Sequence, residues 1–152
     1  MPVELVEIRN LRAGSGVQVH ANPASIRIEH AVPWERHARS RGDHTVLEFE
    51  NQGPSILTCE LTFKGVGTPP NVYKEFVEPL TRMTQVPTDG PADERHPPHC
   101  LFVRGAGFPK FKGVIESLVT TYVEFADNGA PLAAICEIRM RAAGTLHARA
   151  RR

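Results

Sequence analysis

The chain has 152 residues, a length that suits one domain with a single hydrophobic core. Its hydrophobic fraction of 41% and charged fraction of 23% are those of an ordinary soluble globular protein. A net charge of +1 gives no reason to expect nucleic acid as a partner, and no apolar run approaches the roughly 20 residues that cross a bilayer. The first residues do not form a signal peptide, so we expect synthesis in the cytoplasm and no membrane partner.

The first part of the chain reads as short strands separated by turns. Strands are expected at residues 3–11, 17–19, 25–29 and 45–49. Residues 33–43 are polar, with Trp34 as the one apolar anchor, and we expect an exposed loop there. Residues 55–63 alternate most clearly, because Leu57, Cys59, Leu61 and Phe63 fall on one face of a strand.

One helix is expected in the middle of the chain. Asn71 follows two prolines and is a suitable N-cap residue. The apolar residues after it recur at helical spacing; they are Val72, Phe76, Leu80 and Met83. Pro79 lies inside this pattern and should kink the helix or split it into two turns. Residues 87–99 are rich in proline and charge, which indicates a loop.

The last third is predicted to hold a long hairpin. Short strands at residues 100–103 and 108–112 precede it. Its arms are residues 114–125 and 132–140, and Asp127-Asn128-Gly129 forms the turn between them.

Strict alternation makes the first arm of this hairpin apolar on both faces. It places Ile115, Val119, Val123 and Phe125 on one face, and Val114, Leu118 and Tyr122 on the other. A strand of this kind needs a cover on each side, which is a first indication of oligomerisation. A second interpretation is that the hairpin is the central pair of an ordinary sheet.

The residues that could carry chemistry do not form a recognisable site. The three cysteines lie in expected strands and are interpreted as buried thiols of a protein made in a reducing compartment. His96 and His99 are separated by two prolines that hold them apart, and no second pair of metal ligands follows. There is no GxSxG motif, and the adjacent Asp43 and His44 would point to opposite faces of a strand. We therefore expect no catalytic, cofactor or metal site.

Several short motifs, taken together, resemble a known family. They are Asn22-Pro23 with Ile26 and Ile28, residues 56–63, residues 97–105, residues 111–118 and residues 122–134. In order, they are similar to the family patterns NP..I, L.LEL.F, PP.v.F.WG, F.G.I.SL and YT.F..dG.PvRA. The chain resembles the tube-protein-like domain of contractile injection systems, in particular the tube-initiating component at the tube–baseplate junction.

The chain departs from the family pattern at a few positions. Arg104 stands where the family usually has Trp, and Ala133 where it usually has Arg. A LysM module often follows this domain, but the chain ends where its linker would begin, so no such module is expected.

The resemblance implies a mainly β fold of two packed antiparallel sheets, a small split β-barrel with one flanking helix, as in phage tail tubes. It places this domain at residues 1–142 and leaves residues 143–152 as a flexible basic tail. It further implies hexameric rings in which the sheets of neighbouring subunits join into an inner barrel. The residues expected at that interface or inner barrel are Val114, Leu118, Val119, Tyr122, Val123, Phe125 and Ile138.

The function implied is structural: a ring that connects the spike or baseplate hub to the inner tube and initiates tube assembly. Its partners would be further copies of the chain, the inner tube protein, the spike or hub protein and baseplate proteins, within a phage tail-like particle. Two alternatives are a tail tube or baseplate protein of a contractile phage, and a small β-barrel ligand-binding domain or enzyme.

Overall fold

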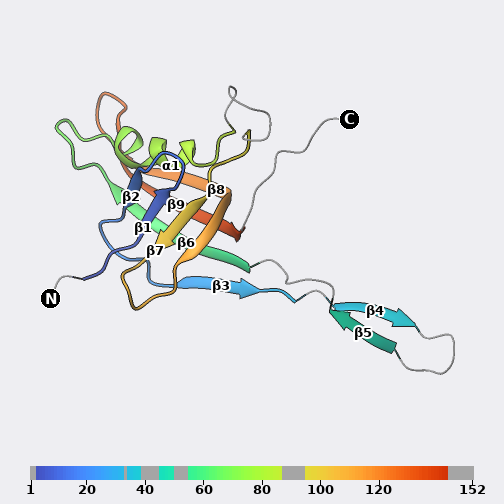
Figure 1. Ribbon diagram of the computed structural model, residues 1–152. Coiled ribbons are helices and arrows are strands. Elements are labelled where there is room, and N and C mark those ends of the chain that lie inside the picture. Colours follow the sequence, from blue (N-terminus) through green and yellow to red (C-terminus); the bar gives the residue numbers. More distant parts are fainter. Residues whose placement is uncertain (1–2, 33, 39–44, 50–54, 87–94, 144–152) are drawn as a thin grey trace.

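The computed structural model describes residues 3–32, 34–38, 45–49, 55–86 and 95–143. Most of its strands belong to one antiparallel sheet with the order β2-β1-β7-β8-β9-β6-β3 (Figure 1). These strands are β1 (Glu7–Asn10), β2 (Gly16–Gln18), β3 (Ile26–His30), β6 (Ser55–Lys64), β7 (Cys100–Val103), β8 (Phe111–Phe125) and β9 (Pro131–Ala142). A separate two-stranded pair consists of β4 (Trp34–Ala38) and β5 (Thr45–Phe49).

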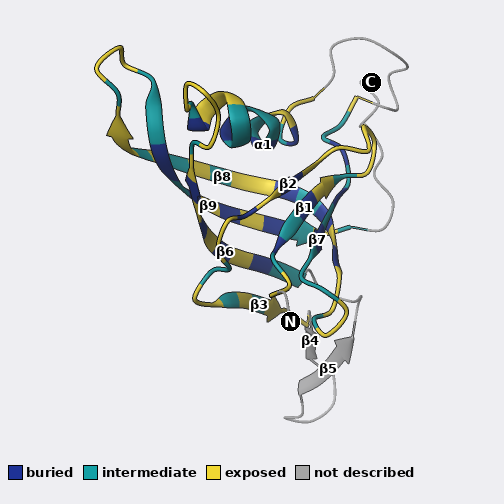
Figure 2. Cartoon of the chain, turned by 90° about the vertical axis from the view of Figure 1, so that its left-hand side faces the viewer, coloured by how far each residue is buried: buried dark blue, intermediate teal, exposed yellow. Residues whose placement is uncertain are grey.

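The expectation of a mainly β fold with one flanking helical segment is confirmed. Two packed sheets were expected, but these strands form one sheet. Strand β8 lies between two groups of three strands and joins them. One half is β2-β1-β7 and the other is β9-β6-β3. Figures 1 and 2 show this sheet curling on itself without closing, and β2 and β3 remain its two edges.

The core lies on the face of the sheet that the helical segment covers. Strand β6 shows why: its odd-numbered residues from Leu57 to Phe63 are buried and the even-numbered ones from Thr58 to Lys64 are exposed. Side chains from both halves of the sheet meet in this core; the largest fully buried ones include Ile8, Leu57, Leu61, Phe63, Phe102, Ile138 and Met140. Burial of each large apolar side chain stabilises the fold by about 1.5–3 kcal/mol.

The helical segment is split, as Pro79 predicts. It consists of η1 (Tyr73–Val77), a π-helical turn, and α1 (Glu78–Arg82). Pro79 has no amide hydrogen and so cannot make the α-helical hydrogen bond to the carbonyl four residues earlier. The N–H of Glu78 bonds instead to the carbonyl of Tyr73, five residues earlier, as in a π-helix. The predicted apolar face is also confirmed, since Val72, Leu80 and Met83 are buried and Phe76 packs against the core.

Side-chain hydrogen bonds hold the turn between β6 and the helical segment. The side-chain oxygen of Asn71 accepts a hydrogen bond from the N–H of Lys74 at 3.2 Å, which confirms its capping role. The carboxylate of Glu75 accepts hydrogen bonds from the N–H groups of Val66 (2.8 Å), Gly67 (2.7 Å) and Asn71 (2.7 Å). These bonds, that from Asn71 first, hold the pKa of Glu75 below its ordinary value.

Two sequence expectations were wrong in detail. Residues 34–38, expected in an exposed loop, form β4 and pair with β5, with Trp34 opposite Phe49. This strand is identified by its backbone pairing with β5. The short strand expected at residues 108–112 is not separate, because β8 starts at Phe111 and continues into the hairpin. The predicted tail lies outside the described residues from position 144 onward.

A close backbone approach near the start of β8 requires glycine. Gly113 pairs with Ala142, and a Cβ at this position would clash with the carbonyl oxygen of Arg141. We expect Gly113→Ala to lower the free energy of unfolding by about 1–3 kcal/mol, measured by urea denaturation. Gly107→Ala is the control, because a Cβ there meets nothing within 4 Å. Equal stability of the two variants would contradict this account.

The Glu75 carboxylate predicts a pH dependence of stability. Its folded pKa is lowered, so its contribution is complete above the unfolded pKa of about 4.3 and is lost as pH falls through the folded pKa. We expect Glu75→Gln to be less stable by about 1 kcal/mol at neutral pH, with the difference shrinking in acid. Thermal unfolding across this pH range measures it. Glu78→Gln, which removes only the exposed pair with Arg82, should change stability by less.

Candidate assembly surface

The residues predicted for the interface or inner barrel lie in three environments. Ile138 is buried in the core of its own chain. Three others are half-buried: Val114, Leu118 and Tyr122. The remaining three are more than half exposed: Val119 (51%), Val123 (53%) and Phe125 (58%). The structure therefore brings only Val119, Val123 and Phe125 to the solvent; they are called the exposed apolar row below.

A β-bulge separates these residues from the core. Ile115 pairs with Met140 and Ser117 with Arg139, so Glu116 is an extra residue in β8. Beyond the bulge, Leu118 and Tyr122 pair with Ile138 and Ala134 on the core side. Grouping Ile115 with Val119 on one face was therefore wrong. Ile115 is buried and Val119 is exposed, because the inserted residue reverses the alternation between them.

Two arginines hold the inserted residue. One carboxylate oxygen of Glu116 accepts a hydrogen bond from Nε of Arg139 at 3.1 Å. The other accepts from Nε (3.2 Å) and Nη2 (2.8 Å) of Arg141. The hydrogen bond from Arg141, followed by that from Arg139, keeps the pKa of Glu116 below its ordinary value. The alternation of the second arm placed Arg139 and Arg141 on one face, but it did not predict that Glu116 would be their partner or that a bulge would form there.

The exposed apolar row belongs to the part of β8 that lies beyond this bulge. Figure 2 shows the exposed residues along β8 and at the free end of the β8–β9 hairpin. The turn at that end is the predicted one: Gly129 has a φ of +90°, and its N–H bonds to the carbonyl of Ala126 at 2.9 Å. The hairpin therefore carries exposed apolar side chains on a hydrogen-bonded support. Two further register shifts between Tyr122 and Phe125 interrupt the alternation there, and the rings of these two residues lie 6.5 Å apart between centroids.

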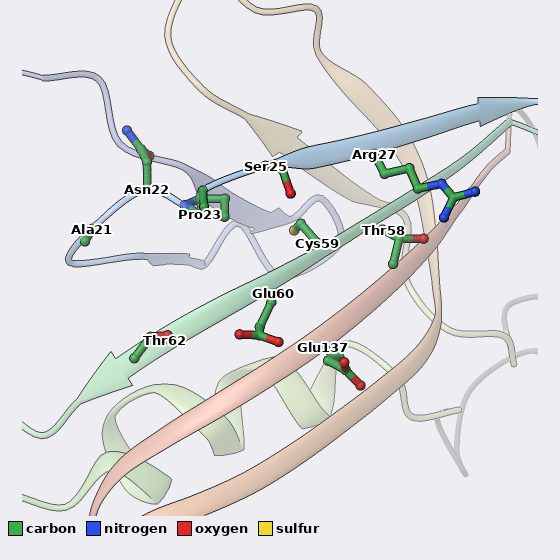
Figure 3. A pocket seen from close by; sticks show the side chains of 11 residues that line it. Ala21, Asn22, Pro23, Ser25, Arg27, Thr58, Cys59, Glu60, Thr62 and Glu137 are labelled. Carbon is green, nitrogen blue, oxygen red and sulfur yellow. The ribbon is translucent and has the colours of Figure 1, made fainter.

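A shallow groove of about 550 Å³ lies elsewhere, at the edge formed by β3 and β6 (Figure 3). Its lining includes Arg27, Glu60 and Glu137, and the two glutamates are directly opposite each other across β6 and β9. The residues that line it include no histidine. Its one thiol, Cys59, has a pKa raised by burial to about 12, so it does not supply a thiolate nucleophile near neutral pH.

The histidine pair does not form a metal centre in the described residues. The rings of His96 and His99 are 6.4 Å apart between centroids. No group of three or more His, Cys, Asp or Glu side chains in the described ranges is arranged to hold a metal ion. Nor does any helix in that part of the chain have the length and apolar character needed to cross a membrane.

The fold is that of a mainly β protein, and its longest strand presents the exposed apolar row. A family profile described as contractile injection system tube protein matches residues 6–151. The chain belongs to the contractile injection system tube protein family. This family is a structural component of phage tail-like assemblies and not a family of enzymes, and the resemblance inferred from the motifs is confirmed at this level.

Comparison with solved structures finds the same fold in a chain from a particle described as the virion of a native gene transfer agent. The two chains are 17% identical, the match covers 97% of this chain and 96% of the other, and the TM-score is 0.50. At this identity the likeness concerns the fold alone. A comparison with curated proteins finds no match.

The buried thiols give a direct test of the core. Cys59, Cys100 and Cys136 are free and buried; burial raises the pKa of Cys100 to about 11 and also raises that of Cys136. We expect these thiols not to react with a disulfide reagent in the native protein at about pH 8, close to the ordinary thiol pKa. In denaturant all of them should react. Rapid reaction of a native thiol, followed by absorbance, would contradict the packing described here.

Proposed function

We propose that this protein forms the ring that connects the spike or baseplate hub to the inner tube and that initiates tube assembly. In this proposal, copies of the chain close into a hexameric ring whose sheets join into an inner barrel. The inner tube protein, the spike or hub protein and baseplate proteins are its partners in the particle. Family membership supports a structural role, and the argument for a ring comes from the surface of β8.

The observation that carries the proposal is the exposed apolar row. Elsewhere among the residues whose side chains are described (3–32, 55–86 and 95–143), the exposed large hydrophobic side chains lie outside the strands, in loops, turns and the helical segment, as with Val66 and Val86. Among the strands of the seven-stranded sheet, whose side chains are described, only β8 presents several. Exposed apolar side chains gathered on one strand are typical of protein–protein contacts, and covering apolar surface gains about 25 cal/mol per Å².

The open sheet supports the same conclusion. β2 pairs only with β1 and β3 only with β6, so each has one side without a neighbour among the described strands. Unpaired strand edges favour association with other chains, and closure of a ring satisfies them. Within the proposed ring, Val119, Val123 and Phe125 contact a neighbouring subunit. Leu118, Tyr122 and Ile138 hold β8 in position from its packed side, whereas Val114, half-buried and paired with Arg141, lies on the other face.

Replacing one valine of the row should separate assembly from folding. Val119 is 51% exposed in the single chain, so we expect Val119→Asp to fold normally and to form no closed ring. A carboxylate placed in a dry contact costs several kcal/mol. Mass photometry measures the assembly, and circular dichroism the fold. Val86→Asp is the matched control, because Val86 is similarly exposed at 52% but lies away from β8. A ring formed normally by Val119→Asp would overturn this interface.

The position of the protein in the particle distinguishes the proposal from its alternative. Cryo-electron microscopy of purified particles should place it in a ring at the junction of tube and baseplate. If it is found repeated along the whole tube, it is the tail tube protein instead. A chain that stays monomeric and is absent from every particle would refute both.

A further inference from the structure

A second surface feature lies near the start of β8 and is rich in positive charge. It is a shallow pocket of about 260 Å³. Its lining residues are Leu11, Arg12, His96, His99 and Lys112, called the basic pocket below. They come from the turn after β1, from the segment before β7 and from β8, and the folded sheet brings them together.

Two side chains of the basic pocket, Arg12 and Lys112, are cations without a matching acid among the described residues. No described carboxylate lies within ion-pair distance of Arg12 or Lys112. The guanidinium of Arg12 lies 3.2 Å from Nδ1 of His96, and this contact does not balance its charge. Leu11, at the rim, is 44% exposed and adds an apolar contact. The pocket is therefore suited to a carboxylate with an apolar neighbour.

The free end of the β8–β9 hairpin of the same chain has the complementary composition. Glu124 and Asp127 are both exposed there, and Phe125 between them is 58% exposed. Figure 2 shows this end of the hairpin standing clear of the helix and of the rest of the sheet. The acidic tip and the basic pocket cannot meet within one chain as it is folded, because Lys112 lies at the beginning of β8 and Glu124 at its end.

We propose that the basic pocket of one copy binds the acidic hairpin tip of a second copy. Carboxylates of Glu124 and Asp127 would pair with Lys112 and Arg12, while Phe125 packs on Leu11. Two different patches meet in this contact, so it is a head-to-tail interface that passes from copy to copy around a ring or along a filament. It goes beyond the proposed function, because it requires neither a place at the baseplate nor an inner barrel.

A charge exchange tests the pairing. Exposed ion pairs are individually weak, so we expect Lys112→Glu or Glu124→Lys to weaken self-association about 3- to 10-fold, measured by sedimentation velocity. The double variant Lys112→Glu/Glu124→Lys should recover most of the association, because the swapped tip again meets a swapped pocket. Lys110→Glu, a charge change at a residue outside the pocket lining, is the control and should have little effect. The proposal would be overturned if neither single variant weakened self-association. It would also be overturned if the loss in the double variant equalled the two single losses combined.

Carbodiimide cross-linking identifies the contact independently of its strength. In a mixture of isotopically labelled and unlabelled protein, we expect a cross-link between Lys112 of one copy and Glu124 or Asp127 of another. Cross-links from Lys112 only to other acids would overturn the proposal. This cross-linking result is independent of the test of the ring interface. Val119→Asp changes neither the basic pocket nor the hairpin tip, so this variant can fail to form a ring and still form the cross-link between two copies.

Discussion

The structure depends on one strand that serves two half-sheets. β8 pairs with β7 at its beginning and with β9 along most of its length, so its backbone must approach that of β9 closely where the two halves meet. Gly113 lies at this point, where any side chain would collide with the carbonyl of Arg141. Because the approach is between two backbones, no rotamer change can relieve such a collision. The single curled sheet follows from this contact.

The bulge at Glu116 then decides which residues of β8 are inside. With strict alternation Ile115 and Val119 would lie on the same face of β8, so both would face the core or both would face the solvent. The inserted residue directs Ile115 to the core and Val119 to the solvent. Arg139 and Arg141 hold the insertion from the outside. These surface ion pairs thus lie at the register shift that places Ile115 in the core and Val119 in the solvent.

The residues behind the family resemblance have structural roles that the motif alone did not reveal. The side chain of Asn22 accepts a hydrogen bond from the N–H of Val6 and donates one to the carbonyl of Glu4, each at 2.8 Å. It thereby ties the segment before β3 to the approach to β1. Gly113 belongs to another of these motifs. Such residues maintain the shape of the sheet, whereas the contacts that we propose between subunits use β8 and the hairpin tip.

The sequence by itself determined the features that repeat locally. Alternation in residues 55–63, the turn at Gly129 and the break at Pro79 each depend on neighbours in the chain, and all were predicted correctly. Only the tertiary structure decided the bulge, because Glu116 is held by arginines more than twenty residues away. It also decided the pairing of β4 with β5 and the meeting of Arg12, His96 and Lys112 in one pocket. These depend on contacts between distant segments, which periodicity along the chain does not encode.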